Sequence, residues 1–368
     1  LTLSGTGATA KAGSGGLLYV GTTSSAVGVL IASSAVVSAQ SSATSPQISL
    51  LGTATQISLT VTAAASFSSS LNGLVFASAA TGVTTLLASA STVSMGNGNY
   101  LVAYAVSQAG SAAHTCTAST ACVNTGISCA GSTSLMTVSM NGCTMSMSLT
   151  SNHALVGSST SLALTLIGTT VSCIATTDAF ATGAISTLSH MQLTTATIYG
   201  RNIVSATGTV TLATIIADTS SRFTPATGAF LAMSSSAISL TSSTISMTGS
   251  SAITVGSCFL IGGAVSSVGI TLNAASCLVT YGSNMGISIG GAVTATTLSL
   301  SGATISVAGG AAAVLLGSSA SSLTISPIAS SSITAAAGDA FQIPAVTSFL
   351  FYESASTVSA SASVSYTH

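Results

Sequence analysis

The residues that could perform acid–base chemistry are few, and four of them fall in one stretch of the chain. Asp178, Arg201, Asp218 and Arg222 follow one another at intervals of 23, 17 and 4 residues. A glycosidase needs two carboxyl groups that flank the scissile bond, and a calcium-dependent lyase needs carboxylates that hold the ion near a base. These four residues are therefore the candidates for catalysis. The simpler interpretation is structural, because the first interval would let Asp178 and Arg201 stack and form an ion pair.

The rest of the chain has almost no charge. Only 2% of its residues are charged, its formal net charge is -1, and no Asp, Glu, Lys or Arg lies between Lys11 and Asp178. Ordinary soluble domains contain about a quarter charged residues. Nucleic-acid binding requires clustered Lys and Arg, so a total of 3 such residues excludes a nucleic-acid partner. We also expect no cofactor and no bound metal, since the His and Cys residues lack the spacing of zinc sites.

The 7 cysteines suggest cross-links between strands. Cys258 and Cys277 are 19 residues apart, which is a little short of one coil of a solenoid, so stacked neighbours there would suit a disulfide. Disulfides within the cluster from Cys116 to Cys143 would likewise cross-link a loop or a cap. The alternative is that free cysteines fill core positions as small hydrophobic residues. Disulfides would indicate an oxidising compartment, and hence an extracellular, cell-surface or virion-surface location.

The hydropathy of the chain is high, at a mean of +0.79. Its apolar runs are nevertheless short: the segment 26–32 is followed at once by Ser33 and Ser34. A membrane-spanning helix needs about 20 predominantly apolar residues. We therefore expect no transmembrane segment. The chain begins at Leu1 without a basic segment, so we also expect no signal peptide within it.

Period-two alternation predicts the elements that must position these residues. From about residue 236 the chain repeats a short phrase of alternating small polar and aliphatic residues, as in 244–247 (TISM), 270–272 (ITL) and 304–307 (TISV). Alternation of this kind is typical of strands with one buried side. Met136, Met140, Met145 and Met147 also alternate with polar residues, which predicts the core side of strands.

The spacing of the strand phrases predicts how they assemble. Three phrases occupy roughly 22 to 28 residues, which suits one coil of a three-sided parallel β-helix. In this rhythm the chain resembles the right-handed parallel β-helix proteins, which include pectate lyases, phage tailspikes and autotransporter passengers. The resemblance includes no family motif, so it transfers no catalytic residue. We expect a β-solenoid over 1–345, best supported from about residue 190, and a C-terminal cap or tail over 346–368. An antiparallel β-sandwich is the alternative fold.

The outward positions of such a solenoid would be mainly Ser and Thr. A hydroxylated, nearly uncharged surface has little repulsion between copies, and near-neutral proteins tend to associate. Ranks of Thr-x-Thr, as in ice-binding solenoids, begin at Thr53, Thr60, Thr115, Thr195, Thr209 and Thr294. Their intervals are irregular, so the pattern does not predict a flat regular rank.

These observations predict a non-catalytic structural or adhesive component of an extracellular or surface assembly or filament. Its expected partners are copies of itself and glycans. The alternative function is a β-helix enzyme, a lyase or glycosidase, that degrades polysaccharide as part of a fibre or tailspike.

Overall fold

The computed structural model describes most of the chain as strands, and its described residues contain no helix. These residues are 1–4, 8–12, 16–21, 24–39, 48–51, 54–69, 71, 74–76, 84–95, 102–104, 108–117, 120–123, 126–148, 155–207, 210–233, 239–240, 243–280, 285–309, 312–361 and 365–366. The chain divides into two compact units, unit 1 at Leu1–Ala181 and unit 2 at Thr182–His368. Each is described separately.

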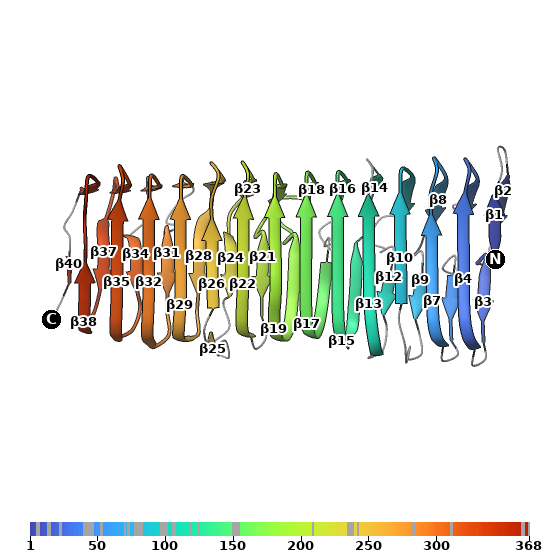
Figure 1. Ribbon diagram of the computed structural model, residues 1–368, viewed down its shortest axis with the longest axis horizontal. Coiled ribbons are helices and arrows are strands. Elements are labelled where there is room, and N and C mark those ends of the chain that lie inside the picture. The colour runs from blue at the N-terminus through green and yellow to red at the C-terminus, as the bar shows by residue number, and fades with distance from the viewer. Residues whose placement is uncertain are drawn as a thin grey trace. The chain divides into compact units, whose positions relative to one another are not determined.

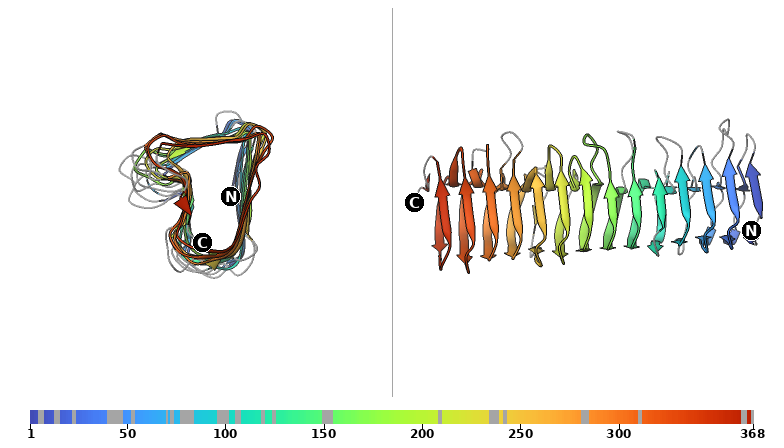
Figure 2. Two further views of the ribbon diagram at one scale, coloured as in Figure 1. Left: turned by 90° about the vertical axis from the view of Figure 1, so that its left-hand side faces the viewer. Right: turned by 90° about the horizontal axis from the view of Figure 1, so that it is seen from above.

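Each unit repeats a coil of three strands, which form a long face, a short face and a third face (Figures 1 and 2). In unit 1 the long face contains β1 (Thr2–Ser4), β4 (Ser24–Ala32), β7 (Ala54–Val61), β10 (Thr84–Ser89), β13 (Gln108–Thr117), β15 (Ile127–Asn141) and β17 (Leu155–Ile167). The short face contains β2 (Thr9–Ala12), β5 (Val36–Ala39), β8 (Ser66–Ser69), β11 (Thr92–Met95), β14 (Ala121–Val123), β16 (Thr144–Ser146) and β18 (Thr170–Ser172). The third face contains β3 (Leu18–Val20), β6 (Ile48–Leu50), β9 (Leu74–Phe76) and β12 (Val102–Tyr104), and continues into the first residues of β15 and β17.

Unit 2 follows the same order of strands. Its long face contains β19 (Phe180–Thr194, which begins at the end of unit 1), β22 (Val210–Asp218), β26 (Ser243–Met247), β29 (Ala264–Asn273), β32 (Val293–Ser301), β35 (Ala320–Ile328) and β38 (Val346–Phe351). The short face contains β20 (Thr197–Gly200), β23 (Arg222–Pro225), β27 (Ala252–Val255), β30 (Ser276–Val279), β33 (Thr304–Val307), β36 (Ser332–Ala335) and β39 (Thr357–Ala360). The third face contains β21 (Val204–Ala206), β24 (Ala229–Met233), β28 (Ser257–Ile261), β31 (Ile287–Ile289), β34 (Ala312–Leu316), β37 (Asp339–Ile343) and β40 (Ser365–Tyr366), while β25 (Ser239–Leu240) pairs with the start of β29.

The pairing of these strands confirms the predicted parallel solenoid. Within each unit the described pairings are parallel and join a strand to its counterpart one coil further along, as Val29 pairs with Leu59 and Ile270 pairs with Leu298. These partners are 30 and 28 residues apart in the chain. The antiparallel sandwich considered from the sequence is therefore wrong: strands of four or five residues joined by short turns are compatible with either fold, and only the pairing distinguishes them.

The core of each unit lies inside its coils, where successive inward side chains stack on one another. Ile245, Ile270, Leu298 and Ile325 form one such column in unit 2, and none is more than 2% exposed. In unit 1 the four methionines of 136–147 are buried, as their alternation predicted. Burial of about 25 cal/mol per Å² of apolar surface is what holds these coils together without charge.

Tight corners connect the long face to the short face. Several use two consecutive residues with positive φ, for example Ala63 and Ala64 (55° and 60°) and Thr219 and Ser220 (49° and 61°). Such a conformation costs about 1 to 2 kcal/mol per residue for an L-amino acid. Hydrogen bonds between coils offset this cost: the amide of Ala64 donates to the carbonyl of Ala90, and that of Ser220 to the carbonyl of Gly249.

Parallel pairing continues through the segment 346–368, for which a cap or tail was expected. β38 pairs with β35, β39 with β36, and β40 with β37. The role of this segment as a cap stays a prediction.

Candidate functional site

The long face of unit 2 carries two rows of small hydroxylated residues. On β26, β29, β32 and β35 the outward side chains form a first row at 244, 269, 297 and 324 and a second row at 246, 271, 299 and 326. We call the seven hydroxyl residues of these rows the hydroxyl array: Thr244, Ser246, Thr271, Thr297, Ser299, Thr324 and Ser326. Gly269 occupies the remaining position.

The spacing of the array follows from the sheet. Neighbouring parallel strands are about 4.8 Å apart, and outward residues along one strand are about 6.6 Å apart. Seen along the coil axis, the long face is a straight side of the coil (Figure 2). The array is therefore a flat two-dimensional grid of hydroxyl groups.

The hydroxyl groups of the array are available to an external partner. Thr244, Thr271 and Thr297 are exposed, and the other members are partly exposed. None of the seven hydroxyls forms a hydrogen bond with another residue that the structure describes. Their donors and acceptors thus face solvent, in contrast to Thr224 and Thr254 on the short face, whose hydroxyl oxygens lie 3.4 Å apart.

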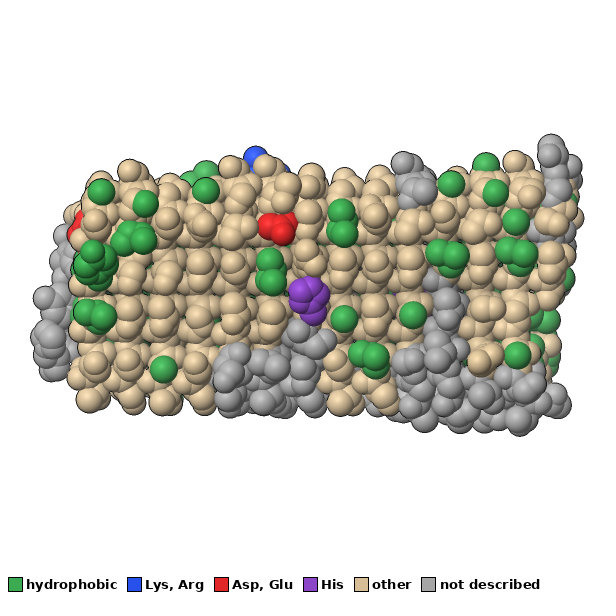
Figure 3. Space-filling model, viewed as in Figure 1, with side chains coloured by type: hydrophobic (Ala, Val, Ile, Leu, Met, Phe, Trp, Pro, Cys, Tyr) green, Lys and Arg blue, Asp and Glu red, His purple; other side chains and the backbone are tan. Residues whose placement is uncertain are grey.

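The surface around the array is nearly free of charge. Most side chains on this face are neither hydrophobic nor charged (Figure 3). Among the described long-face residues of unit 2, Asp218 at the end of β22 is the charged one. On the other side the grid ends at β38, where Leu350 and Tyr352 are 57% and 59% exposed.

A rigid layer lies directly beneath the array. The inward residues that alternate with it, such as Leu298 and Leu300 on β32, are 2% exposed or less. Because interiors are packed as densely as organic crystals, these columns hold the outward positions at fixed spacing.

The Thr-x-Thr positions noted in the sequence do not themselves build this grid. Thr53 and Thr209 lie outside the described residues, and Thr195 occupies a corner at φ 51°. Thr294 is exposed but Thr296 is buried, so that pair does not share one side of β32. Sequence reasoning missed the array because it searched for threonine alone; a search for either hydroxyl residue at every second position, repeated once per coil, would have found it.

None of the catalytic candidates is a member of the array. Asp178 is buried between β18 and β19 in unit 1, whereas Arg201 is exposed directly after β20 in unit 2. Because the two residues belong to different units, their expected stacking stays a prediction.

Asp218 and Arg222 flank one corner of unit 2. The Nη1 of Arg222 donates to the carbonyl oxygens of Ser250 at 2.6 Å and Ser221 at 3.3 Å. The carbonyl oxygen of Asp218 accepts from the hydroxyl of Ser221 at 2.7 Å. The bond between Ser221 and Asp218 closes the corner, and the bond from Arg222 to Ser250 links it to the corner of the next coil, which is a structural role.

Two carboxylates of unit 2, Asp218 and Glu353, are widely separated. Asp218 ends β22 and Glu353 follows β38, five strand steps further on, which corresponds to about 24 Å. Asp339 begins β37 on the third face. Glycosidase carboxyl pairs lie about 5 to 9.5 Å apart, so Asp218 and Glu353 do not form such a pair.

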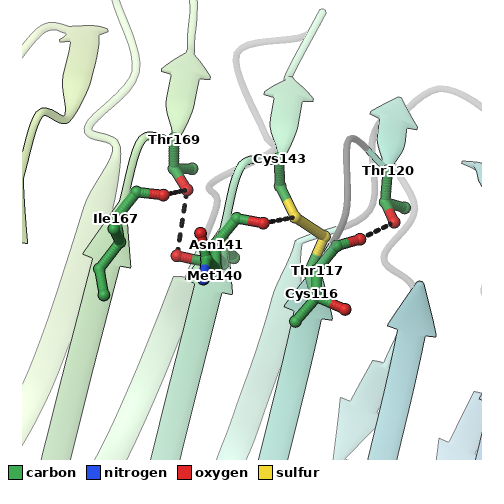
Figure 4. Close-up of a disulfide and its surroundings, with 8 residues drawn as sticks. All are labelled: Cys116, Thr117, Thr120, Met140, Asn141, Cys143, Ile167 and Thr169. Atoms are coloured by element: carbon green, nitrogen blue, oxygen red, sulfur yellow. Dashed lines mark hydrogen bonds between the residues drawn. A yellow bond between two sulfur atoms is a disulfide. The ribbon is translucent and has the colours of Figure 1, made fainter. Parts of the chain in front are cut away.

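One disulfide fastens adjacent coils of unit 1. Cys116 near the end of β13 is bonded to Cys143 at the next corner, with 6.4 Å between their Cα atoms (Figure 4). At the equivalent corner positions the hydroxyl of Thr120 donates to the carbonyl of Thr117 (2.6 Å), and that of Thr169 donates to the carbonyls of Ile167 and Met140. Cys143 therefore places a covalent link where its neighbours have hydrogen bonds.

The second disulfide crosses the interior of unit 2. Cys258 on the third face is bonded to Cys277 on the short face of the next coil, with 6.1 Å between their Cα atoms. Both residues are at most 1% exposed. Cys173, also among the described residues, is buried and forms no disulfide.

The described residues contain no group of three or more His, Cys, Asp or Glu side chains that could hold a metal ion. They also form no helix long and apolar enough to span a membrane. Comparison of the chain with protein-family models, with curated proteins and with solved structures gives no match.

Proposed function

We propose that this protein is a non-catalytic structural or adhesive component of an extracellular or surface assembly, and that it binds its partners through the long face of unit 2. The observation that carries the proposal is the hydroxyl array, a flat and uncharged grid whose hydroxyl groups have no partner among the described residues.

The physical reason for binding through this face is that little free energy is needed to remove it from water. A charged surface must lose its hydration or find counter-charges on contact, whereas Ser and Thr hydroxyls donate and accept and adapt to many partners. Copies of a protein with a formal charge of -1 also repel one another weakly. A second copy or a neutral glycan surface is therefore the expected partner.

The two disulfides support an extracellular location. Both are buried and join adjacent coils, and such bonds persist in oxidising compartments. The alternative of a polysaccharide-degrading enzyme has no comparable support, since Asp218 and Glu353 are about 24 Å apart.

Sedimentation velocity of the full chain, with and without an insoluble neutral polysaccharide, tests the proposal. We expect the protein to self-associate or to pellet with the polysaccharide, and Thr297→Lys/Ser299→Lys to abolish this by placing two charges in the array. Thr304→Lys/Ser306→Lys is the matched control, because these residues occupy outward positions on the short face of the same coil. A protein that stays monomeric and unbound under all conditions would contradict the proposal.

A further inference from the structure

We propose that the hydroxyl array is a binding site for crystalline water, so that the surface to which this face adheres is ice. This inference rests on one part of the proposed function, namely that the long face of unit 2 is the adhesive surface, and it assigns ice to that face in place of a second copy or a glycan.

The first argument is the periodicity of the grid. It repeats in two directions, at about 4.8 Å across the strands and about 6.6 Å along them. A soluble partner of irregular shape gains nothing from such a repeat, whereas a crystal presents the same contact at every step.

The second argument is the chemistry of the grid. Its members supply one hydroxyl each, and the threonines add a methyl group beside it. A hydroxyl donates one hydrogen bond and accepts two, so it can replace a water molecule at a lattice position. Ordered waters held between protein groups cost at most about 2 kcal/mol each in immobilisation, and a rigid grid already holds its hydroxyls in place before binding.

The third argument distinguishes ice from a sugar surface. Aromatic side chains, which combine a flat apolar body with a polar tip, are absent from the array, and Tyr352 lies outside it, directly after the end of β38. The array also carries no charge. A charge would orient the nearest waters around itself and disturb a lattice, so its absence favours an ordered water layer.

Substitution of Gly269 provides a test in which binding to ice should increase. It fills a position of the first row between Thr244 and Thr297, and a Cβ added there would meet no atom within 4 Å. Gly269→Thr would therefore complete the row without a steric clash. A role in folding alone predicts no gain of ice affinity from this change.

The experiment is partitioning of the full-length protein into a slowly growing ice crystal. We expect enrichment of the wild type in the ice, greater enrichment of Gly269→Thr, and a roughly tenfold loss for Thr297→Lys/Ser299→Lys, which corresponds to about 1.4 kcal/mol. Thr304→Lys/Ser306→Lys should partition like the wild type. Circular dichroism of each variant establishes that it is folded, and Gly269→Thr provides a readout that does not depend on a disruptive change.

Three outcomes would overturn the inference. If the wild type is excluded from ice while the array variant still abolishes self-association or polysaccharide binding, the ligand is not ice and the proposed function stands. If the wild type is excluded and the array variant also leaves association unchanged, both proposals fail. Equal enrichment of the array variant and the wild type would place any ice contact elsewhere.

Discussion

The long faces of the two units share one coil design but present different surfaces. The row of unit 1 that corresponds to the second row of the array consists of Leu30, Thr60, Leu87, Thr115, Ser139 and Thr165. Apolar residues interrupt this row twice, with Leu30 36% exposed, and its longest hydroxyl run has three members. In unit 2 the apolar Ile216 on β22 precedes a run of four hydroxyl residues, Ser246, Thr271, Ser299 and Ser326. Since both units form the same coil, the fold does not require the longer hydroxyl run of unit 2.

The interiors differ as well. Unit 2 contains a cluster of three phenylalanines, with ring centroids 4.6 Å apart for Phe223 and Phe230 and 6.0 Å apart for Phe230 and Phe259. Among the described residues, unit 1 buries five methionines and His114, whereas unit 2 buries three methionines and no histidine. An unbranched methionine fills irregular space, and a buried imidazole must remain neutral. The comparison therefore predicts different responses of the two units to mutation and to pH.

The largest expected effect is the loss of the aromatic cluster. Phe230→Ala should destabilise unit 2 by about 3 to 5 kcal/mol, because Phe230 is fully buried and its removal leaves a cavity. Urea unfolding monitored by hydrogen exchange measures each unit separately. Tyr352→Ala, at a 59% exposed position, is the control and should change stability by less than about 0.5 kcal/mol. Equal loss of protection in both units would show that they do not unfold independently.

The two disulfides should contribute similar amounts to the free energy of unfolding of their units. The bonded cysteines are 27 residues apart in unit 1 and 19 in unit 2, and loops of this length predict about 3 kcal/mol each. We expect Cys116→Ser/Cys143→Ser to destabilise unit 1 and Cys258→Ser/Cys277→Ser to destabilise unit 2. The measurement is urea unfolding of both double variants and of the reduced wild type. Wild-type stability that is unchanged by a reductant would refute the prediction.

Acid should destabilise unit 1 through His114. Burial lowers the pKa of His114 from 6.5 to about 4. Between these values the unfolded chain binds a proton that the folded chain does not, so stability is complete above pH 6.5 and declines as the pH falls toward 4, by about 3 kcal/mol in total. Unfolding of unit 1 between pH 4 and 7 measures this slope, and His114→Leu should remove it. His190→Gln, a half-buried position of unit 2, serves as the control; an unchanged slope in His114→Leu would assign the effect to another group.

The smallest expected effect is a difference in stability between substitutions of two glycines at equivalent outward positions. Gly269→Thr should stabilise unit 2 by about 0.5 to 1 kcal/mol, since glycine weakens a strand interior and the site has open space. Gly28→Thr should stabilise unit 1 by less, because a Cβ there would lie 3.3 Å from the hydroxyl oxygen of Ser58. Thermal unfolding of both variants measures the difference. A larger gain at Gly28 would mean that neighbouring side chains do not limit these positions.

The strand content and the coil could be predicted because their signal is local. Alternation in segments such as 244–247 identifies the inward residues, and three strands plus turns fix the approximate coil length. The corners were beyond prediction, since Ala63, Ala64, Thr219 and Ser220 are not residues that favour positive φ. Hydrogen bonds within each corner and to the neighbouring coil stabilise them there.

The sequence by itself determined an uncharged all-β chain, the identity of its inward residues and the approximate length of its coils, because composition and period two depend only on nearby residues. The tertiary structure decided which outward residues become neighbours. Ser246, Thr271, Ser299 and Ser326 are separated by 25, 28 and 27 residues, and yet they form one straight row. Loops of unequal length absorb the differences, while parallel hydrogen bonding fixes the register of the strands.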